Sequence, residues 1–396
     1  MRKRILYISY DGILEPLGNS QVLKYLEGLS HEFEITLISF EKINTPDQLE
    51  DFSKMKNYCK QKKIRWRPKK YNLINGPISN IINILKITAA PLIELTFKKH
   101  EIVHIRSYMP GLAMPVIKKF FNFKLIFDIR GFWADEKVDR LGWKKTSLKY
   151  KFFKKLESNL FKNADIVVTL TNSSKNYIEK HFHKPNKKIK VIRTCVDLNE
   201  FNINQRNFDE NKNTQELLIG YLGSIDTAYN FYDFIRFIKD LVDRKVTVKL
   251  IILSKTSRER VLFYLQKFQL ENLEFDVLFL KRNELSEKIN QFNLLGFALK
   301  ESFSLIASMP TKIAESLACG TPIICNNFNA DIEEMLQNNS IGILHDFSKP
   351  LTNDNFQKII SLIKNVSTPV ICNSFSQKHF SLEGGIEKYK QIYSNL

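Results

Sequence analysis

Cysteine, acidic side chains and uninterrupted hydrophobic segments are all scarce in this sequence. Its 396 residues include five cysteines, none in a Cys-x-x-Cys pair or at metal-ligand spacing, which favours reduced thiols in a cytosolic protein. The most apolar long stretch, 78–97, is interrupted by Asn83, Lys86 and Pro91. We therefore expect an amphipathic helix there rather than a transmembrane helix, which needs about 20 predominantly apolar residues.

The shortage of acids leaves a strongly positive chain. There are 42 Asp and Glu against 60 Lys and Arg, a formal charge of +18. This predicts an anionic partner, which is nucleic acid, a membrane surface or a phosphorylated substrate. No Asp-x-Asp stands where a strand is expected to end, so neither a bound metal nor a cofactor is expected. The apolar run Ile5–Ile8 is too short for the core of a signal peptide, and we expect a cytoplasmic protein.

Short β-branched segments alternate with helical periodicity along the chain, which is typical of parallel α/β units. The length suits two such domains. The polar stretch 201–216 (FNINQRNFDENKNTQE) has the composition of a linker. We expect an N-terminal domain over 1–205, a C-terminal domain over 206–375, and a C-terminal helix over 376–396 that packs back toward the first domain. Strands are expected at 4–9, 34–40, 102–106, 124–129, 165–171 and 190–193, and then at 217–222, 246–253, 275–280, 294–299, 322–325 and 341–345.

The strongest local pattern is SMPTKIAESLACGTP, which begins at residue 308. Pro310 and Thr311 suit the start of a helix, and the free N–H groups of a helix start bind anions such as a diphosphate. Lys312 adds a cation in the first turn. Glu315, one turn further, can accept two hydrogen bonds from ribose hydroxyls. An ordinary capped helix with a surface Lys–Glu pair explains the spacing about equally well.

Polar and flexible residues also follow several expected strands, where doubly wound folds bind their ligands. In the first domain they are Gly12 and Gly18 after the first strand, Arg106 and Ser107 at the strand 102–106, and Asp128, Arg130 and Glu136 after the strand 124–129. In the second domain they are Gly223 and Ser224, whose N–H groups can bind phosphate, and Lys255 after the next strand. For Asp128 and Arg130 the alternative is a salt bridge that supports a loop.

These segments resemble the glycosyltransferases of family 4, which are retaining enzymes. The family's pattern is a glutamate, seven residues, a second glutamate and then Ala-x-Gly-x-Pro. Glu315 matches the second glutamate, which the resemblance implies binds the ribose of the donor. Ala307 stands in place of the first glutamate, which leaves contact with the donor sugar to other residues. Candidates are Lys300, Ser302, Ser304 and Ser308.

A second departure concerns the phosphates. Many members carry an arginine and a lysine after the loop that corresponds to Gly223 and Ser224. Both are absent here, so Lys312 or Lys255 is left to supply the charge. The loops 10–21 and 127–136 resemble those of a bacterial branch that builds surface polysaccharides.

The resemblance implies an α/β fold with the GT-B architecture, in which two Rossmann-like domains face each other across a cleft. It implies metal-independent transfer of a sugar from a UDP- or GDP-linked donor, with retention, to a glycan or polyprenyl-diphosphate-linked acceptor. The expected donor residues are Gly223, Ser224, Lys255, Pro310, Thr311, Lys312 and Glu315. The expected catalytic residues are Asp128, Arg130 and Glu136, with Gly12, Gly18, Arg106 and Ser107 in a donor or acceptor loop.

Two other functions remain open from the sequence. A sugar-nucleotide epimerase with a similar two-domain fold would use one substrate and form no acceptor-linked product. A nucleic-acid-binding protein is suggested by the basic run 54–70, which interleaves cations with Trp66. A salt-dependent mobility shift would identify it.

The distribution of charge predicts a peripheral position at the inner face of the cell membrane. Basic runs at 54–70 and 137–155 flank the stretch 78–97, where Ile78, Ile81, Ile82, Leu85 and Ala89 share one helical stripe. Such a stripe can enter the membrane interface while the cations attract anionic lipid. The alternative is a core-facing helix whose stripe is buried against the sheet.

Overall fold

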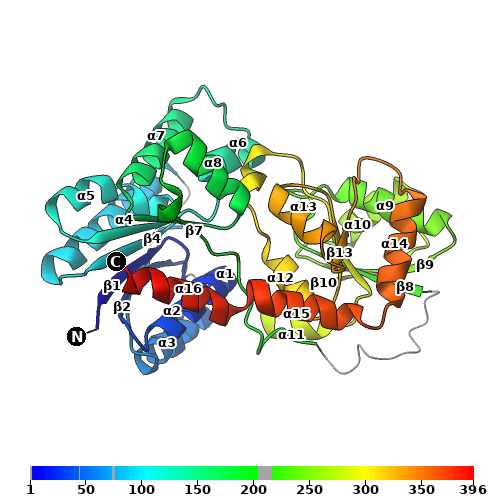
Figure 1. Ribbon diagram of the computed structural model, residues 1–396, viewed down its shortest axis with the longest axis horizontal. Coiled ribbons are helices and arrows are strands. Elements are labelled where there is room, and N and C mark those ends of the chain that lie inside the picture. Colours follow the sequence, from blue (N-terminus) through cyan, green and yellow to red (C-terminus); the bar gives the residue numbers. More distant parts are fainter. Residues whose placement is uncertain (1, 44, 74–75, 204–215) are drawn as a thin grey trace. The chain divides into compact units, whose positions relative to one another are not determined.

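The computed structural model describes residues 2–43, 45–73, 76–203 and 216–396. They form two compact units, each a parallel sheet with helices on its faces (Figure 1). The first unit comprises Met1–Arg193 and Leu382–Leu396, and the second comprises Thr194–Ser381. The division falls at 193/194 rather than at the expected 205/206.

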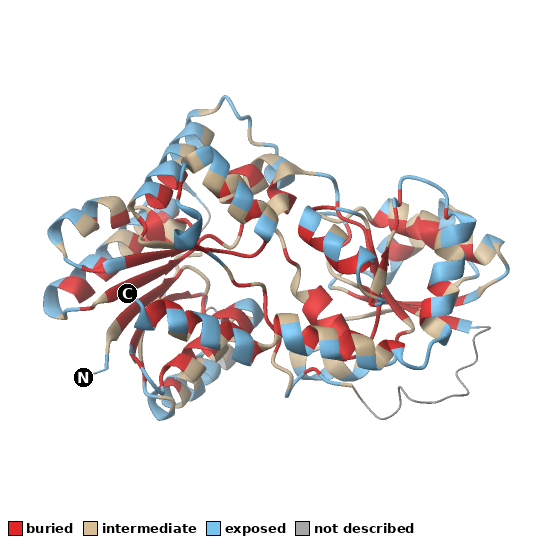
Figure 2. Cartoon of the chain, viewed as in Figure 1, coloured by how far each residue is buried: buried red, intermediate tan, exposed pale blue. Residues whose placement is uncertain are grey.

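The sheet of the first unit has the order β3-β2-β1-β4-β5-β6-β7. Its strands are β1 (Arg4–Ser9), β2 (Glu34–Glu41), β3 (Ile64–Lys70), β4 (Ile102–Arg106), β5 (Lys124–Asp128), β6 (Ile166–Thr169) and β7 (Ile189–Val191). The chain order reverses between β1 and β4, which is the switch point at which open parallel sheets bind ligands. The central strands are β-branched and almost fully buried, as expected for strands covered on both faces (Figure 2).

Helices connect these strands on both faces of the sheet. They are α1 (Pro16–Gly18), the π-helix η1 (Asn19–Leu23), α2 (Lys24–Leu29), α3 (Pro46–Gln61), α4 (Pro77–Phe97), the 3-10 turn η2 (Met109–Gly111), α5 (Met114–Phe120), α6 (Trp133–Leu141), α7 (Leu148–Asn163), α8 (Asn172–Phe182) and the 3-10 turn η3 (Asn186–Lys188). The last helix of the chain, α16 (Leu382–Ser394), packs against α2 and completes this unit.

The second unit repeats the plan with a six-stranded sheet of order β10-β9-β8-β11-β12-β13. Its strands are β8 (Glu216–Leu222), β9 (Thr247–Leu253), β10 (Glu274–Leu278), β11 (Leu294–Phe297), β12 (Ile323–Cys325) and β13 (Gly342–Leu344). Its helices are α9 (Phe231–Asp243), α10 (Arg258–Gln266), α11 (Arg282–Ile289), the 3-10 helix η5 (Phe303–Ala307), α12 (Thr311–Ala318), α13 (Ala330–Gln337), α14 (Asn353–Lys364) and α15 (Thr368–Phe380).

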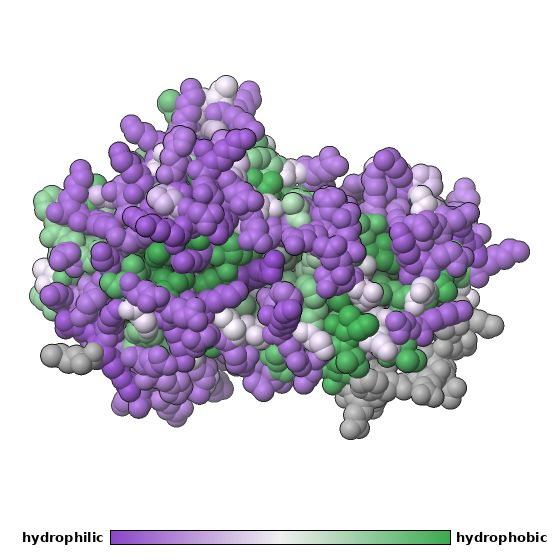
Figure 3. All heavy atoms as spheres, viewed as in Figure 1, coloured by the Kyte–Doolittle hydropathy of each residue, from purple (hydrophilic) through white to green (hydrophobic). Residues whose placement is uncertain are grey.

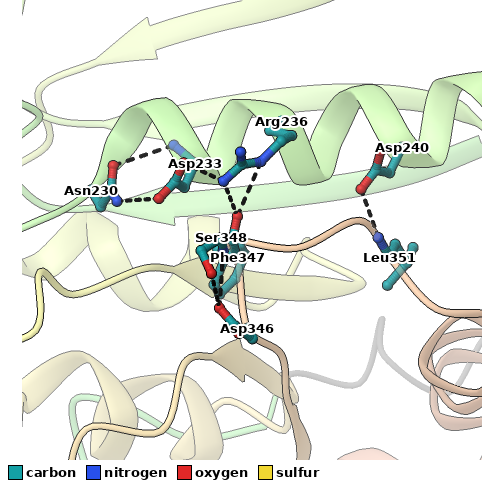
Figure 4. Close-up of polar contacts among 8 residues, drawn as sticks. All are labelled: Asn230, Asp233, Arg236, Asp240, Asp346, Phe347, Ser348 and Leu351. Atoms are coloured by element: carbon teal, nitrogen blue, oxygen red, sulfur yellow. Dashed lines mark hydrogen bonds and ion pairs between the residues drawn. The ribbon is translucent and has the colours of Figure 1, made fainter.

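The loop after β13 is held against α9 by polar contacts at two points (Figure 4). Arg236 of α9 donates through Nε to the carbonyl oxygen of Phe347 at 3.2 Å. Further along the helix, Asp240 accepts from the backbone N–H of Leu351 at 2.8 Å. These contacts hold β13, an edge strand, against the body of the unit. Within α9 itself, the side chain of Asn230 caps the N–H of Asp233 at 3.3 Å.

Three local expectations need correction. The basic run at 54–70 contains the end of α3 and an edge strand, β3, that was not expected. The helix expected over 376–396 is two helices, because the chain turns at Ser381 and α15 belongs to the other unit. The stretch 78–97 is one continuous helix despite Pro91, and by length and composition it is long and apolar enough to cross a membrane, with a third of its most apolar window buried. The expectation that Asn83, Lys86 and Pro91 exclude a transmembrane helix was therefore too strong.

Candidate active site

In the first unit, charged side chains gather at the carboxyl ends of β1, β4 and β5, beside the switch point. Asp128 is the last residue of β5 and is fully buried. Three cationic or titratable groups surround its Oδ2: Arg106 Nη1 at 3.8 Å, Arg130 Nη1 at 3.9 Å and His104 Nε2 at 3.8 Å. Asp128, Arg130 and Arg106, all expected site residues, are thus brought together.

Two tyrosines of α16 reach into the same cluster. Tyr389 donates its hydroxyl to Asp128 Oδ2 at 2.9 Å, and the Tyr393 hydroxyl lies 2.7 Å from His104 Nδ1. Both tyrosines are buried. The C-terminal helix therefore holds the two side chains that flank the carboxylate.

Electrostatics in this cluster favour an ionised Asp128 and a neutral His104. Burial alone raises the pKa of Asp128, but the charges of Arg130 and Arg106 and the contact with His104 outweigh it, so the net pKa is lowered. Burial lowers the pKa of His104. The buried Arg106 and the half-buried Arg130 then face this carboxylate, and Arg106 Nε also lies 3.7 Å from Oδ2 of the more exposed Asp11.

Hydrogen-bonding capacity is also unused here. In the described part of the chain, Asp128 Oδ1 and Arg106 Nε are buried without a hydrogen-bond partner. Buried polar atoms are normally satisfied, and exceptions call for a functional explanation. The cluster therefore has one donor and one acceptor that make no hydrogen bond and are available to a polar ligand, although Arg106 Nε forms a longer ion pair with Asp11 at 3.7 Å.

The backbone at the ends of β4 and β5 is held in unusual conformations. Ser107 and Arg130 have φ of 67° and 54°, a region that non-glycine residues rarely occupy, and Gly131 has φ of 150°. The N–H of Ser107 donates to the carbonyl oxygen of Asp128 at 2.7 Å. This bond ties the two strand ends together and fixes where Arg106 and Arg130 emerge.

Glu136 lies in the first turn of α6 and folds over Gly131. A Cβ built on Gly131 would lie 2.2 Å from Glu136 Oε1, so glycine is required beneath it. Burial raises the pKa of Glu136, and the charges of Arg140 and Lys137 offset only part of this. Glu136 thus lies just beyond the loop after Asp128, and within the described structure it forms no ion pair with Arg106 or Arg130.

The loop after β1 is compact, and its glycines contact protein. A Cβ on Gly18 would lie 1.9 Å from the carbonyl oxygen of Gly12, and one on Gly12 would lie 2.5 Å from Glu41 Oε2. Glu41 also accepts from the N–H of Ile13 at 3.0 Å. The glycines expected to let backbone approach a ligand are required by this packing.

In the second unit the expected helix forms where the pattern placed it. Pro310 is the N-cap of α12, Thr311 is its first residue, and Gly320 follows it with φ of 75°. Thr311 is half-buried. Lys312 and Glu315 are both buried, so the alternative of a surface Lys–Glu pair is wrong.

Lys312 is a buried cation that has no ion pair among the described residues. Its Nζ donates to the carbonyl oxygen of Leu222, lies 3.9 Å from the ring centroid of Tyr229 and 4.9 Å from that of Phe297. Burial lowers the pKa of its ammonium. A carbonyl dipole and aromatic faces thus solvate the charge in place of a carboxylate.

Gly223, directly after β8, lies against this ammonium. Its φ is 134°, and a Cβ there would lie 2.8 Å from Lys312 Nζ. The structure therefore brings the expected phosphate loop and the expected cation together. Ser224 continues the loop, and its hydroxyl is hydrogen-bonded to that of Thr227.

Glu315 is bound by an arginine that the sequence pattern did not identify. Arg282, at the start of α11, donates through Nη1 to Glu315 Oε1 at 3.0 Å and through Nε to Glu200 Oε2 at 3.1 Å. Burial raises the pKa of Glu315, and Arg282 offsets part of that effect. One arginine thus orients a buried carboxylate on the same face of α12 as Lys312.

Other expected phosphate ligands are placed less directly. Lys255 follows β9 with its ammonium 4.8 Å from the ring centroid of Phe279. Asp226 lies in the region where many family members carry an arginine and a lysine. It accepts from Arg260 Nε at 2.9 Å and from the Tyr264 hydroxyl at 2.6 Å. The loop after Ser224 therefore carries an acidic residue, Asp226, that pairs with Arg260 of α10.

Ala307, in place of the family's first glutamate, is fully buried at the end of η5. Ser304 is buried and Lys300 is exposed. The N–H of Lys300 donates to the carbonyl oxygen of Ala228 at 3.0 Å, which brings this segment beside the loop after β8. In the regions that the structure describes, no group of three His, Cys, Asp or Glu side chains has metal-binding geometry.

Sequence reasoning missed His104, Tyr389, Tyr393 and Arg282. His104 was within reach, because it alternates with Arg106 toward the same face of β4. The tyrosines lie 261 and 289 residues from their partners in the chain, and Arg282 lies 33 residues from Glu315. No local spacing connects residues at such separations.

Family models match the two halves of the chain in turn. Glycosyltransferase Family 4 matches residues 22–200, and Glycosyl transferases group 1 matches residues 202–378. None of the curated proteins matches the sequence.

Solved glycosyltransferase structures share the fold. Sucrose-phosphate synthase from Thermosynechococcus elongatus is 14% identical with a TM-score of 0.74, over 100% of this chain and 99% of that one. HepE from Anabaena, in complex with UDP and glucose, is 12% identical with a TM-score of 0.69 over 100% of both chains. WaaG, a glycosyltransferase involved in lipopolysaccharide biosynthesis, is 12% identical with a TM-score of 0.67 over 98% of this chain and 99% of its own.

At these identities the structures establish the fold, and the two models establish the family. The two parallel α/β units are the Rossmann-like domains of the GT-B fold, as expected. The chain belongs to the family 4 glycosyltransferases.

Proposed function

We propose that this glycosyltransferase moves a sugar from a nucleoside diphosphate to a hydroxyl of a glycan or lipid-linked acceptor, with retained anomeric configuration. The observation that carries the proposal is Lys312, a buried ammonium beside the Gly223 loop that is solvated by a carbonyl and aromatic rings. A buried charge without a counter-ion is costly, and an anion beside it removes that cost. The diphosphate leaving group is such an anion.

In the proposed reaction, the transition state is stabilised by positive charge beside the diphosphate rather than by a pair of catalytic carboxylates. The bond between the anomeric carbon and the diphosphate oxygen breaks, and its electron pair stays on the phosphate. Lys312 and the N–H group of Ser224 stabilise that charge. The N–H of Gly223, which was also expected to bind phosphate, is instead donated to the carbonyl oxygen of Leu253 at 3.1 Å. The acceptor oxygen bonds to the anomeric carbon on the same face, and its proton passes to the leaving phosphate.

For the donor, we assign the ribose to Glu315 and place UDP before GDP. Glu315 is buried, has a raised pKa and is oriented by Arg282, so hydroxyl donors that bind it would favour its charged form. Solved relatives support the choice of UDP, since HepE and TarM of S. aureus were each captured with UDP.

The proposed donor site needs no metal, because Lys312 supplies the positive charge beside the diphosphate. Transfer activity is therefore expected to survive EDTA. Loss of activity on chelation with recovery by Mn²⁺ would contradict this.

For the acceptor, we assign the cluster around Asp128. Arg106 and Arg130 place two guanidinium groups beside Asp128, and Arg106 Nε makes no hydrogen bond, which suits an acceptor phosphate or diphosphate. Asp128 and Glu136 are then candidates to orient the acceptor hydroxyl. The involvement of WaaG in lipopolysaccharide biosynthesis supports a surface-polysaccharide acceptor.

Nucleotide binding is the first test. UDP, GDP and ADP are added to the protein in a thermal-shift assay, where a ligand at a hundred times its Kd adds about 2.7 kcal/mol of stability. Lys312→Met is expected to weaken nucleoside diphosphate binding by about 1.5–3 kcal/mol. Because it removes a buried charge, it should not destabilise the free protein. Lys364→Met, an exposed lysine of α14, is the control, and unchanged affinity in Lys312→Met removes this residue from the site.

Product analysis is the second test. Incubation with UDP-sugars and a polyprenyl-diphosphate acceptor should give an acceptor-linked sugar with the donor's anomeric configuration by NMR. Free nucleotide with an epimerised sugar would support the epimerase instead. Nucleic-acid binding has less support, because Trp66 already has partners within the protein. Its indole N–H donates to Ser39 Oγ at 2.7 Å, and the centroid of its ring lies 5.0 Å from that of Phe52.

A further inference from the structure

The long helix α4 turns its apolar side chains outward. Ile78 is 74% exposed, Leu85 60% and Phe97 85%. Exposed apolar neighbours lie along the same helix: Ile81, Ile84, Leu92 and Ile93. Hydrophobic atoms reach the surface at the left edge of this unit in Figure 3, where α4 and α5 lie in Figure 1. The alternative that the stripe is buried against the sheet is wrong, and only Ile82 of the five stripe residues is half-buried.

The inward face of α4 buries Ile87 and Leu95 and also makes polar contacts. Asn83 is buried, donates to the carbonyl oxygen of Asn72 and accepts from its N–H, each at 2.9 Å. Near the other end, Glu94 pairs with Arg65 of β3 at 3.2 Å. A surface helix in water normally buries its apolar stripe and exposes a polar one. Because α4 exposes apolar side chains on its outer face as well, that face indicates apolar surroundings.

Cations border this apolar face. The edge strand β3 runs beside α4, since Arg65 and Arg67 both reach Glu94 and Lys86 donates to the carbonyl oxygen of Lys70 at 2.9 Å. Its sequence, IRWRPKK, contains four cations and no acid. The second basic run, 137–155, contributes less positive charge to the surface than its composition indicates, because Lys154 is largely buried and paired with Asp135 and Glu157.

We propose that the outward face of α4 docks on an anionic lipid surface, with the helix lying in the plane of the interface and the cations of β3 against the headgroups. The rim carries positive charge, which fits anionic lipid. A second copy of the chain would bring the same basic rim to face its own, since a twofold interface pairs identical patches. Lipid therefore satisfies both the apolar face and its border.

The polar contacts also specify the orientation of the helix. A spanning α4 would have to leave Asn72, Arg65 and Arg67, and would carry Asn83 and Glu94 into hydrocarbon, where unpaired polar groups are expensive. An in-plane helix retains all these contacts and buries only the outward stripe. Residues along the stripe should then lie at one depth.

Vesicle flotation tests the docking. The protein is expected to float with phosphatidylcholine–phosphatidylglycerol vesicles and to bind pure phosphatidylcholine far more weakly, with the difference reduced at high salt. The double variant Ile81→Glu/Leu85→Glu should lower partitioning by about tenfold or more. The matched control is Val366→Glu/Val370→Glu, two exposed valines of the second unit, which should bind as the unchanged protein does.

The charge component has its own variant. Arg67→Gln/Lys69→Gln/Lys70→Gln should reduce binding to the anionic vesicles on the order of a hundredfold. It should also remove most of the salt dependence. Equal affinity for both vesicle types, binding to neither, or equal loss in the valine control would overturn the proposal.

Depth is measured with single cysteines at Ile78→Cys, Leu85→Cys and Phe97→Cys, labelled with an environment-sensitive dye. All five native cysteines are buried, which limits background labelling. Quenchers placed at different depths in the lipid should report one shallow depth for all three sites. A helix of 21 residues is about 30 Å long, so a deep Leu85 between two shallow ends would indicate a spanning helix and overturn the in-plane proposal.

Protein partners are separated from lipid by sedimentation. Concentration-dependent self-association without vesicles, abolished by Ile81→Glu/Leu85→Glu, would assign the face to a second copy. None of these measurements uses a donor or an acceptor, so the docking proposal stands or falls independently of the proposed reaction.

Discussion

Within one turn of α12 the chain buries a lysine and a glutamate, and burial acts on them in opposite directions. The pKa of Lys312 is lowered and that of Glu315 is raised, so burial disfavours the charged form of each. In the proposed donor site, a nucleoside diphosphate would supply an anion to the first and hydroxyl donors to the second. The same ligand would then stabilise both charged forms, which makes the pair sensitive to its presence.

Glu315→Gln tests the ribose assignment. The variant keeps the shape of the side chain and loses its charge, and we expect nucleoside diphosphate binding to weaken by about 1–3 kcal/mol, the range for a hydrogen bond to a charged group. Calorimetric titration measures this. Glu334→Gln, an exposed glutamate of α13, serves as control. If the folded Glu315 variant binds nucleotide normally, the carboxylate has no part in the site.

Asp128→Asn should change how stability depends on pH. The folded-state pKa of Asp128 is lowered, so its ion pairs contribute above the unfolded pKa and are lost as pH falls through the lower folded value. At neutral pH the variant should be less stable by about 3 kcal/mol, because Arg130 loses its carboxylate partner and the buried Arg106 keeps only the more exposed Asp11. The difference in Tm should shrink toward pH 3. A constant difference across that range would show that the charge of Asp128 does not stabilise the fold.

The strand ends explain which site residues the sequence could identify. Asp128 and Arg106 terminate neighbouring strands, and a strand end is visible as the point where a β-branched run stops. Tyr389 and Tyr393 were not predictable, because their place depends on where α16 docks. The same holds for Arg282, whose partner Glu315 comes from another helix.

At the scale of elements, α16 packs closely against Gly28 of α2. A Cβ on Gly28 would lie 2.5 Å from Ile386 Cδ1 and 3.1 Å from its Cγ1. Gly28→Val is expected to destabilise the protein by about 1–3 kcal/mol through overpacking. Adding Ile386→Ala should recover part of the loss. Gly384→Ala, at an exposed position of α16, should instead be neutral or stabilising by up to about 1 kcal/mol. Denaturant unfolding would measure all three.

Two elements escaped prediction for different physical reasons. The strand β3 was not predicted because four of its seven residues are cationic, so its sequence lacks the apolar pattern of a buried strand. Charge and proline are tolerated there because β3 is at the sheet edge, where the outer side remains unpaired. The division of 376–396 at Ser381 has no Pro or Gly at the break, whereas Gly384 and Gly385 lie inside α16. Packing rather than local propensity sets that boundary.

For the whole molecule, the first unit depends on residues from both ends of the chain. Removal of 382–396 would expose the Gly28 surface and the cluster around Asp128. We expect the truncated chain to lose protease resistance in 2–193, whereas 194–381 should retain resistance and nucleotide-dependent stabilisation. Limited proteolysis with and without UDP tests this. Collapse of both units together would contradict their independence.

The ends of the second unit meet. The N–H of Val196 donates to the carbonyl oxygen of Phe380 at 2.8 Å, and Val196 pairs with Ser381 in a parallel bridge. Topologically, the second unit is thus an insert in one connection of the first unit, with entry and exit side by side. A segment with adjoining ends can be exchanged as a cassette without stretching its host. If the second unit binds the donor and the first binds the acceptor, as proposed, a graft from 194 to 381 should transfer donor specificity and leave acceptor specificity unchanged.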